Sequence, residues 1–168
     1  MLFRSHYEIE RKYLIRYPDE ALLASQPGAV KWEIEQVYLT SEPGETRRVR
    51  RVQVNGETHC YKTFKRRVTG MTAQEDEGEI DEAAYEALLS EADPMRRAIL
   101  KTRYRIPWQG FLLEFDLYPF WKKQAVLEIE LESEWQTPAI PDWVSVIRDV
   151  SSDFAYKNSQ LAFTIPAE

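Results

Sequence analysis

The segment Tyr7-Glu8-Ile9-Glu10-Arg11-Lys12-Tyr13-Leu14 decides how this chain must fold. In an extended strand, Glu8, Glu10 and Lys12 share one face, and the residues between them share the other. Alternation with a period of two is typical of a strand that separates two different environments. We therefore expect a β-strand here that presents charged groups to one side and bulkier groups to the other.

The same alternation recurs along the chain in further charged rows. Asn55-Gly56 separates two of these rows and supplies the two residues that a tight hairpin turn requires. A loop is expected through residues 107–110. The rows are Arg48 and Arg50; Tyr61, Thr63 and Lys65; Glu75, Glu77 and Glu79; Lys101, Arg103 and Arg105; Glu114 and Asp116; and Glu128, Glu130 and Glu132.

Signals for helices are fewer. Pro18-Asp19-Glu20 predicts the start of a short helix through residues 21–23. Residues 81–92 predict an amphipathic helix that buries Tyr85, Leu88 and Leu89. Further helices are expected over residues 153–161 and around 143–147. No linker divides the chain, so we expect one domain over residues 1–168.

Composition excludes several classes of protein. The 168 residues carry a net charge of −6, and 43% are hydrophobic, which is enough for a packed core. Cys60 is the single cysteine, which excludes a disulfide scaffold and zinc sites built from paired cysteines. Residues 1–8 contain no apolar stretch typical of a signal peptide, and no segment is apolar and long enough to span a bilayer. We expect a cytoplasmic protein with no membrane partner, and a homodimer is left open.

The charged rows also constrain the architecture. Like charges two residues apart on a strand are about 7 Å from each other and repel by roughly 2–3 kcal/mol at an effective dielectric near 20. Too few helices are predicted to cover both faces of a flat sheet of this size. Long antiparallel sheets close readily. We therefore expect a mainly β fold, a closed antiparallel barrel with a charged lumen and an apolar exterior partly covered by helices.

The two signs of charge suggest two kinds of ligand. Glu and Asp clusters without nearby His or Cys favour hard cations such as Mg²⁺ or Mn²⁺. Rows of Arg and Lys favour phosphate, Arg through its two-pronged guanidinium and Lys as a point charge. Acids and bases around one lumen therefore suggest a complex of metal and polyphosphate. The chain contains no Gly-rich phosphate loop, which excludes a P-loop mechanism.

These motifs, in this order, resemble the signature of the CYTH superfamily, the triphosphate tunnel metalloenzymes. The resemblance extends over essentially the whole chain. The matching motifs are Glu8-Ile9-Glu10-Arg11-Lys12, Arg48-Val49-Arg50, Thr63-Phe64-Lys65, Glu75-Asp76-Glu77, Lys101-Thr102-Arg103-Tyr104, Glu114-Phe115-Asp116, Glu128-Ile129-Glu130 and Tyr156-Lys157-Asn158.

The resemblance implies an eight-stranded antiparallel tunnel and a role for each row. It implies metal ligands at Glu8, Glu10, Glu128 and Glu130, with Asp116 serving a second metal. It implies phosphate-binding groups at Lys12, Arg48, Arg50, Lys65, Lys101 and Arg103. Glu75, Glu77 and Glu114 would line the tunnel and orient those bases or hold metal-bound water, so that together with Glu8 and Glu10 they form the catalytic set. Lys157 would begin a C-terminal helix that closes one tunnel end and would contact the substrate, or would only support packing there.

The implied activity is metal-dependent hydrolysis of the terminal phosphate of a small triphosphate. The compact length and residues 36–40 resemble bacterial inorganic triphosphatases, so inorganic tripolyphosphate is the expected substrate. Alternatives are thiamine triphosphate, nucleoside triphosphates, class IV adenylate cyclisation, or polyphosphate binding without turnover. One departure is Ala73, which lies where related chains often have a basic residue.

A nucleic-acid-binding module is an alternative of a different class. The basic block at residues 47–67 would then form an exposed stripe, although the acidic net charge disfavours this reading. We assign the row ends Glu79, Arg105 and Glu132, and also His6, to the solvent. Strand parity assigns further cations to the outer face: Arg11, Arg47, Arg51, Lys62 and Arg66.

Overall fold

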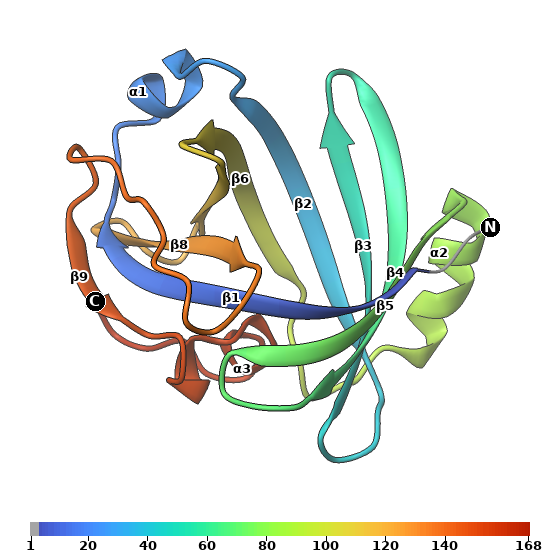
Figure 1. The fold of residues 1–168 in the computed structure, drawn as a ribbon. Helices are drawn as coiled ribbons and strands as arrows, with labels where there is room; N and C mark the ends of the chain where they lie inside the picture. The colour runs from blue at the N-terminus through green and yellow to red at the C-terminus, as the bar shows by residue number, and fades with distance from the viewer. Residues whose placement is uncertain (1–3) are drawn as a thin grey trace.

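The computed structural model describes residues 4–168 and contains nine strands in one antiparallel sheet (Figure 1). Residues 1–3 lie outside the described residues, and the expectation that the N-terminal segment is not a signal peptide falls partly on them. The strands are β1 (Arg4–Arg16), β2 (Val30–Leu39), β3 (Glu45–Val54), β4 (Glu57–Arg67), β5 (Thr72–Ile80), β6 (Ile99–Trp108), β7 (Phe111–Leu117), β8 (Gln124–Leu131) and β9 (Val146–Asp149). The helices are α1 (Glu20–Ser25), α2 (Glu82–Leu88), η1 (Leu89–Glu91), η2 (Phe154–Tyr156) and α3 (Asn158–Leu161).

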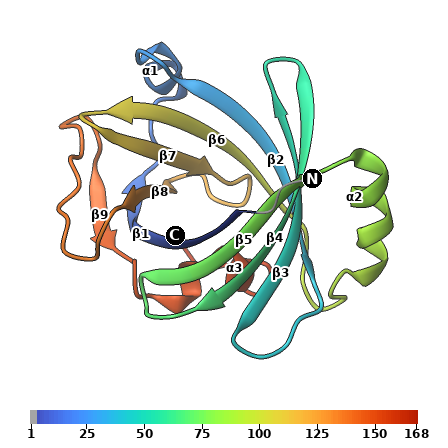
Figure 2. The same ribbon diagram turned by 45° about the vertical axis from the view of Figure 1, so that its right-hand side comes forward.

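Eight of the nine strands close into a barrel. Neighbouring strands follow the order β5-β4-β3-β2-β6-β7-β8-β1, and β1 pairs in turn with β5. His6 lies opposite Glu75 in this closing pair. The ring of strands is visible from both viewing directions (Figure 2). The expected closed antiparallel barrel is confirmed, with β9 as an additional strand outside the ring.

Strand β1 changes its partner halfway along one edge. Residues 4–9 pair with β5, whereas residues 13–15 pair with β9. Between these two pairings, the Glu10 amide donates to the Met71 carbonyl at 3.2 Å, and the Lys12 carbonyl accepts from the Val150 amide at 2.8 Å. The barrel wall therefore opens between β1 and β5, and the C-terminal segment borders this opening.

The outer face of β6, β7 and β8 is apolar and covered. Leu23 of α1 and Phe115 of β7 belong to one buried cluster. Trp143, from the irregular segment 132–145, stacks on Phe115 with ring centroids 5.8 Å apart and meets Trp108 edge-on at 6.3 Å. The expected apolar exterior is confirmed. An irregular segment shares its coverage with the helices.

Helix α2 covers the other side of the barrel. Its Tyr85 is fully buried and clusters with Val49 and Cys60 on the outer faces of β3 and β4. Asp81 caps the helix by accepting a hydrogen bond from the Ala84 amide at 2.7 Å. The helix lies against the outside of the barrel (Figure 2), so the expected helix and its apolar side are confirmed.

Some sequence predictions are wrong. The helix expected around residues 143–147 is absent, because residues 142–143 form a turn and the strand β9 begins at Val146, in keeping with the β-branched Val146 and Ile147. The expected loop at 107–110 is shorter, because β6 continues to Trp108 and only Gln109-Gly110 form a turn with positive φ angles. The expected helix at 153–161 is divided at Lys157 into η2 and α3.

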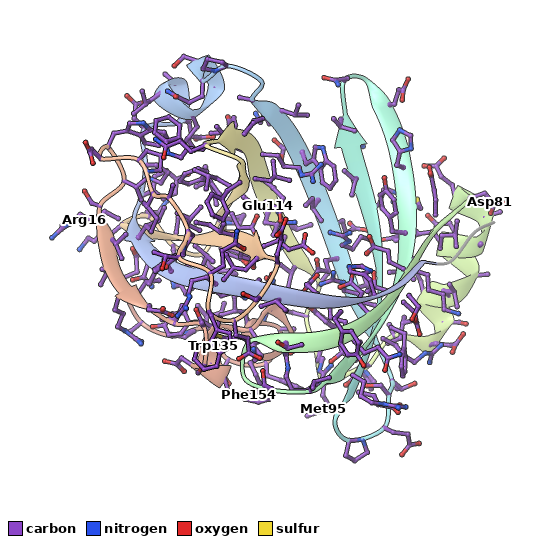
Figure 3. The ribbon with its side chains drawn as sticks, in the orientation of Figure 1. Arg16, Asp81, Met95, Glu114, Trp135 and Phe154 are labelled. Atoms are coloured by element: carbon purple, nitrogen blue, oxygen red, sulfur yellow. The ribbon has the colours of Figure 1, made fainter. Side chains whose placement is uncertain are left out.

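The side chains divide between the inside and the outside of the barrel. Glu114 lies inside, whereas Arg16, Asp81 and Met95 lie at the periphery (Figure 3). On the outer face Arg11 pairs with Asp149 at 3.1 Å, as strand parity predicts for this cation. Within residues 4–168, none of the helices has the length and apolar character needed to cross a membrane.

Candidate active site

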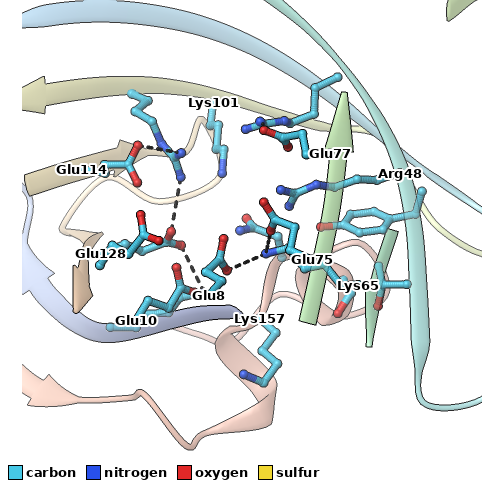
Figure 4. A pocket seen from close by; sticks show the side chains of 18 of the residues that line it. Glu8, Glu10, Arg48, Lys65, Glu75, Glu77, Lys101, Glu114, Glu128 and Lys157 are labelled. Carbon is cyan, nitrogen blue, oxygen red and sulfur yellow. Dashed lines mark hydrogen bonds and ion pairs between the residues drawn. The ribbon is translucent and has the colours of Figure 1, made fainter. Parts of the chain in front are cut away.

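The barrel encloses a cavity of about 240 Å³ lined by charged side chains (Figure 4). Because side chains alternate along each strand, the charged rows of the sequence face one another across this space. Every predicted site residue except Asp116 lines it. These residues are Glu8, Glu10, Lys12, Arg48, Arg50, Lys65, Glu75, Glu77, Lys101, Arg103, Glu114, Glu128, Glu130 and Lys157.

On one wall of the cavity, formed by β6, β7 and β8, the cations Lys101, Arg103 and Arg105 are all ion-paired. Asp116 is 0% exposed and receives Lys101 Nζ at 2.9 Å and the Arg103 Nε and Nη2 at 2.6 and 2.8 Å. Arg103 also contacts Glu114 at 3.1 Å and Glu128 at 3.3 Å. Despite its burial, the pKa of Asp116 is lowered by these two cations. Both carboxylate oxygens of Asp116 therefore contact Lys101 or Arg103. The role of Asp116 as a ligand of a second metal ion stays a prediction.

The opposite wall, formed by β3 and β4, carries a cation without an acidic partner. Arg50 pairs with Glu77 at 3.1 Å and lies over the Tyr61 ring at 5.5 Å. Arg48 forms no ion pair or side-chain hydrogen bond with the described side chains, and its Nε is buried without a partner. The side chain is half-buried, and although burial opposes its charge, the nearby Tyr38, Glu75 and Glu77 raise the pKa of Arg48 and keep it protonated. Arg48 is therefore free to bind a ligand.

Lys65 lies at the centre of a second group on β1, β4 and β5. Its Nζ is 2.8 Å from Glu8 and 3.1 Å from Glu75. Burial alone would raise the pKa of Glu8, but Lys65 holds it well below its usual range. Further along the same face of β1, Lys12 Nζ is 3.2 Å from Glu128 and 3.3 Å from the Tyr156 carbonyl oxygen. These contacts keep Glu8 and Glu128 ionised.

Glu10 and Glu130 are lining acids that have no ion pair among the described side chains. Glu10 lies directly opposite Glu130 in the pairing of β1 with β8. Burial, followed by the charges of Glu128 and Glu8, raises the pKa of Glu10 to about 8. Burial and Glu8 also raise the pKa of Glu130. Like charges directly opposite each other across two strands are unfavourable unless a cation lies between them.

These carboxylates fit a hard divalent cation in chemistry, but in this conformation they are not gathered around one point. Within residues 4–168, no group of three or more His, Cys, Asp or Glu side chains lies close enough together to hold a metal ion. The reason is that Glu8 and Glu128 are occupied by Lys65 and Lys12. Metal binding would require these pairs to loosen, and the crowding around Glu10 favours that exchange.

Sequence analysis missed several residues of the cavity. Arg105, assigned to solvent as a row end, lines the cavity, contacts Glu114 at 3.1 Å and stacks 4.3 Å above the Trp32 ring. His6, also assigned to solvent, lies 3.9 Å from Glu75. Strand parity could have found both, because each continues a row by one step. The other missed lining residues are Trp32, Tyr38, Thr46, Arg67, Asn158 and Ser159.

Strand β2 escaped prediction for an identifiable reason. Its inward positions carry Trp32, Gln36 and Tyr38 rather than a row of like charges, and Gln36 donates to the Tyr38 hydroxyl at 2.6 Å. The structure also shows what surrounds Ala73, where related chains often have a basic residue. Ala73 is 1% exposed, and Arg67 lies directly across from it on β4. A cation is therefore present at this level of the lumen, on the neighbouring strand.

The fold and the cavity together define a class of protein, an antiparallel barrel whose acids and bases face an inner tunnel. No protein-family model and no curated protein matches this chain. Among solved structures, that of the inorganic triphosphatase NE1496 is 30% identical over 95% of this chain and 97% of its own, with a TM-score of 0.56. The chain belongs to the CYTH superfamily, the triphosphate tunnel metalloenzymes.

More distant structures share the fold. The PH1819 protein of Pyrococcus horikoshii OT3 is 21% identical over 76% of this chain and 80% of its own, with a TM-score of 0.58. HpAC1 from Hippeastrum, an adenylyl cyclase homologue described as having a dominant triphosphatase activity, is 19% identical over 75% of this chain and 80% of its own, with a TM-score of 0.51. At these identities the likeness concerns the barrel alone.

Proposed function

We propose that this protein is a divalent-metal-dependent triphosphatase that releases the terminal phosphate of a small triphosphate, with inorganic tripolyphosphate as the preferred substrate. The observation that carries the proposal is the pairing pattern in the tunnel. Among the described side chains, Arg48 has no acidic partner and Glu10 has no cationic partner, and both line the same cavity. A triphosphate with its metal ion supplies the opposite charge to each. The inorganic triphosphatase NE1496 supports the same reading.

The metal ligands we propose lie on β1 and β8. They are Glu8, Glu10, Glu128 and Glu130, with Mg²⁺ or Mn²⁺ as the cation and Asp116 as the candidate for a second ion. A bound divalent cation would neutralise phosphate charge and lower the pKa of a coordinated water. Lys65 and Lys12 lower the pKa values of Glu8 and Glu128, so both carboxylates are ionised, as metal ligands must be.

Phosphoryl transfer requires positioning and neutralisation of charge more than covalent chemistry. Arg48 and Arg50 would bind phosphate oxygens from one wall, and Lys12, Lys65 and Lys157 from the floor of the tunnel. Lys101 and Arg103 would contribute from the opposite wall, where Asp116 fixes their position.

Three further carboxylates orient cations that we assign to phosphate binding. Glu77 is 3.1 Å from Arg50 and accepts a hydrogen bond from Thr63 at 2.6 Å. Glu75 is 3.1 Å from Lys65. Glu114 bridges Arg103 and Arg105, each at 3.1 Å. These acids would hold the cations in register for an in-line displacement.

The nucleic-acid alternative finds little support in the placement of the basic block. Arg48, Arg50 and Lys65 point into the tunnel, while on the outer face Arg47 is paired with Glu91 and Arg66 with Glu45, each at 3.0 Å. An exposed, unpaired basic stripe is what backbone binding would need.

The test is phosphate release by the purified protein from tripolyphosphate, thiamine triphosphate and ATP, each with Mg²⁺, Mn²⁺ or EDTA. We expect metal-dependent release that is fastest with tripolyphosphate and lost in the Glu10→Gln variant. Glu132→Gln is the matched control, because Glu132 lies just beyond β8 and does not line the cavity. Absence of phosphate release from all three substrates, with cyclic AMP formed from ATP, would replace hydrolysis by cyclisation.

A further inference from the structure

The loop between β2 and β3, the turn between β4 and β5, and the C-terminal segment enclose a second cavity of about 400 Å³. This cavity lies beside the tunnel, and Lys65, Arg67 and Lys157 line both spaces. The C-terminal segment also borders the opening between β1 and β5, because Ser151 Oγ accepts a hydrogen bond from the Lys12 amide at 2.9 Å. A ligand in the second cavity would therefore contact the same cations as a ligand at the end of the tunnel.

The boundary between the two cavities carries positive charge that the protein does not neutralise. Among the described side chains, neither Arg67 nor Lys157 forms an ion pair, and the hydrogen bond of Lys157 Nζ is to the Gly70 carbonyl at 3.4 Å. Burial, followed by the charges of Arg67 and Lys12, lowers the pKa of Lys157 to about 8. Cations brought this close without counter-ions are stabilised by a bound anion.

A fourth cation, Arg96, lines the second cavity and not the tunnel. The guanidinium of Arg96 stacks 4.4 Å from the Phe163 ring and 5.5 Å from the Tyr38 ring. Its Nε is 3.5 Å from Asp93. Its Nη1 is buried without a hydrogen-bond partner in the described part of the chain. The stacking fixes the guanidinium in place and leaves donors for an incoming oxygen.

The acids near the second cavity balance only part of this charge, because Lys65 and Arg96 have acidic partners whereas Arg67 and Lys157 have none among the described side chains. Glu42 and Glu45 line this cavity. Glu45 is bound by Arg66 at 3.0 Å, so its charge is already balanced from outside the cavity. Hydroxyl groups of Ser152 and Ser159 supply further donors on its lining. A tetrahedral oxyanion matches this mixture of guanidinium, ammonium and hydroxyl donors.

We propose that the second cavity is an additional phosphate site, in which Arg67 and Arg96 bind one inorganic phosphate group next to the end of the tunnel. The proposal rests on the proposed triphosphatase function for the source of that group. The group is either the orthophosphate that hydrolysis releases or the fourth phosphate of a polyphosphate longer than three units. The tunnel would then hold three phosphate groups and the second cavity one more.

The first experiment measures binding without turnover. Inorganic phosphate is titrated into the full-length protein by calorimetry, using the wild type, Arg67→Gln and Arg96→Gln. Loss of one charged donor should weaken phosphate binding about ten-fold in each variant. Arg97→Gln is the matched control, since Arg97 is exposed, follows Arg96 directly and does not line either cavity. Because Arg67 is also exposed, its variant should fold, and Arg67→Lys should recover part of the affinity.

The second experiment distinguishes the two sources. Inhibition of tripolyphosphate hydrolysis by orthophosphate should weaken in Arg96→Gln, while kcat/KM for tripolyphosphate stays within about two-fold of the wild type. If the site serves longer chains, KM for tetrapolyphosphate should rise about ten-fold in the same variant. If the site serves the product, orthophosphate inhibition alone should change.

Two results would overturn the proposal. Phosphate binding that is equal in the wild type, Arg67→Gln and Arg96→Gln would exclude the second cavity as a phosphate site. If Arg96→Gln lost tripolyphosphate turnover in addition to phosphate binding, Arg96 would belong to the groups that bind the substrate in the tunnel instead. Failure of the triphosphatase function is separate, because it would appear as absence of turnover in a protein whose phosphate binding still depends on Arg67 and Arg96.

Discussion

The two walls of the tunnel carry similar numbers of cations and use them differently. On the wall of β6, β7 and β8, Lys101 and Arg103 are bound to Asp116, a carboxylate that is 0% exposed. On the wall of β3 and β4, Arg48 has no acidic partner among the described side chains. The comparison teaches that an inward-facing cation is not by itself a ligand-binding group. Its availability depends on whether a neighbouring strand supplies a carboxylate.

The largest expected effect comes from breaking the paired wall. Asp116→Ala would leave the buried Lys101 without an acidic partner and Arg103 with only Glu114 and Glu128, so the free energy of unfolding should fall by about 3–5 kcal/mol. Urea denaturation measures this change. Asp149→Ala is the control, because its pair with Arg11 is partly exposed and should contribute less than about 1 kcal/mol. Equal losses in the two variants would contradict the distinction between the paired wall and the surface.

The next largest effect is the stabilisation that a divalent cation should give by binding at Glu10 and the neighbouring carboxylates. Mg²⁺ or Mn²⁺ should raise the melting temperature of the wild type, because binding at 100 times the dissociation constant adds about 2.7 kcal/mol to the free energy of unfolding. Thermal melts with and without EDTA measure this gain, which should be much smaller in Glu10→Gln. A gain of equal size in Glu10→Gln would place the cation elsewhere, and Glu132→Gln should behave as the wild type.

Removing Arg48, which has no acidic partner among the described side chains, should lower activity and leave the free energy of unfolding nearly unchanged. Arg48→Gln should lower kcat/KM for the preferred triphosphate by about 10- to 100-fold, the equivalent of a charge-assisted hydrogen bond. Its urea midpoint should not fall. Arg47→Gln, the neighbour that pairs with Glu91 on the outer face, is the control for activity. A loss of stability in Arg48→Gln with normal activity would reverse the assignment of the two walls.

The smallest expected effect is a pH dependence at the tunnel end. With its pKa near 8, Lys157 is charged below that pH and loses its charge above it. Anion binding uses the charged form, so KM should rise as the pH passes through 8, by up to about ten-fold. A bound anion raises the pKa and moves the change upward in pH. Steady-state kinetics at pH 7–10 measure it.

The conservative variant of Lys157 separates this pH effect from other titrations. The groups around Lys157 are Arg67, Lys12 and Lys65, which lower its pKa, and Glu10, which raises it. Lys157→Arg keeps its charge over the whole range, so the rise in KM near pH 8 should disappear. A rise of the same size in Lys157→Arg would assign the titration to another group.

Much of the barrel could be predicted from the chain because strand alternation is a local property. The row Glu8, Glu10 and Lys12 determined which side chains of β1 share a face, and Asn55-Gly56 marked a turn that the structure contains. Strand β2 could not be found in this way, since its inward positions are not of one charge. Strand β9 was missed because its short apolar run was assigned to a helix.

Most residues that line the tunnel could therefore be predicted from the sequence, but two residues at the ends of the rows were wrongly assigned to the solvent. Arg105 and His6 continue their rows by one step and line the cavity. Asp116 was included by its row, yet it lies behind the cavity surface with Lys101 and Arg103 over it. Parity tells which face a residue occupies, whereas depth depends on the side chains that cover it.

The sequence by itself determined which side chains face the lumen, because a strand repeats every two residues whatever surrounds it. It also determined that both signs of charge would meet there. Only the tertiary structure decided which charges neutralise each other. That outcome depends on the register between strands far apart in the chain, which sets Asp116 beside Arg103 and leaves Arg48 unpaired. The second cavity likewise arises only when the β2–β3 loop, the β4–β5 turn and the C-terminal segment, which are far apart in the chain, come together.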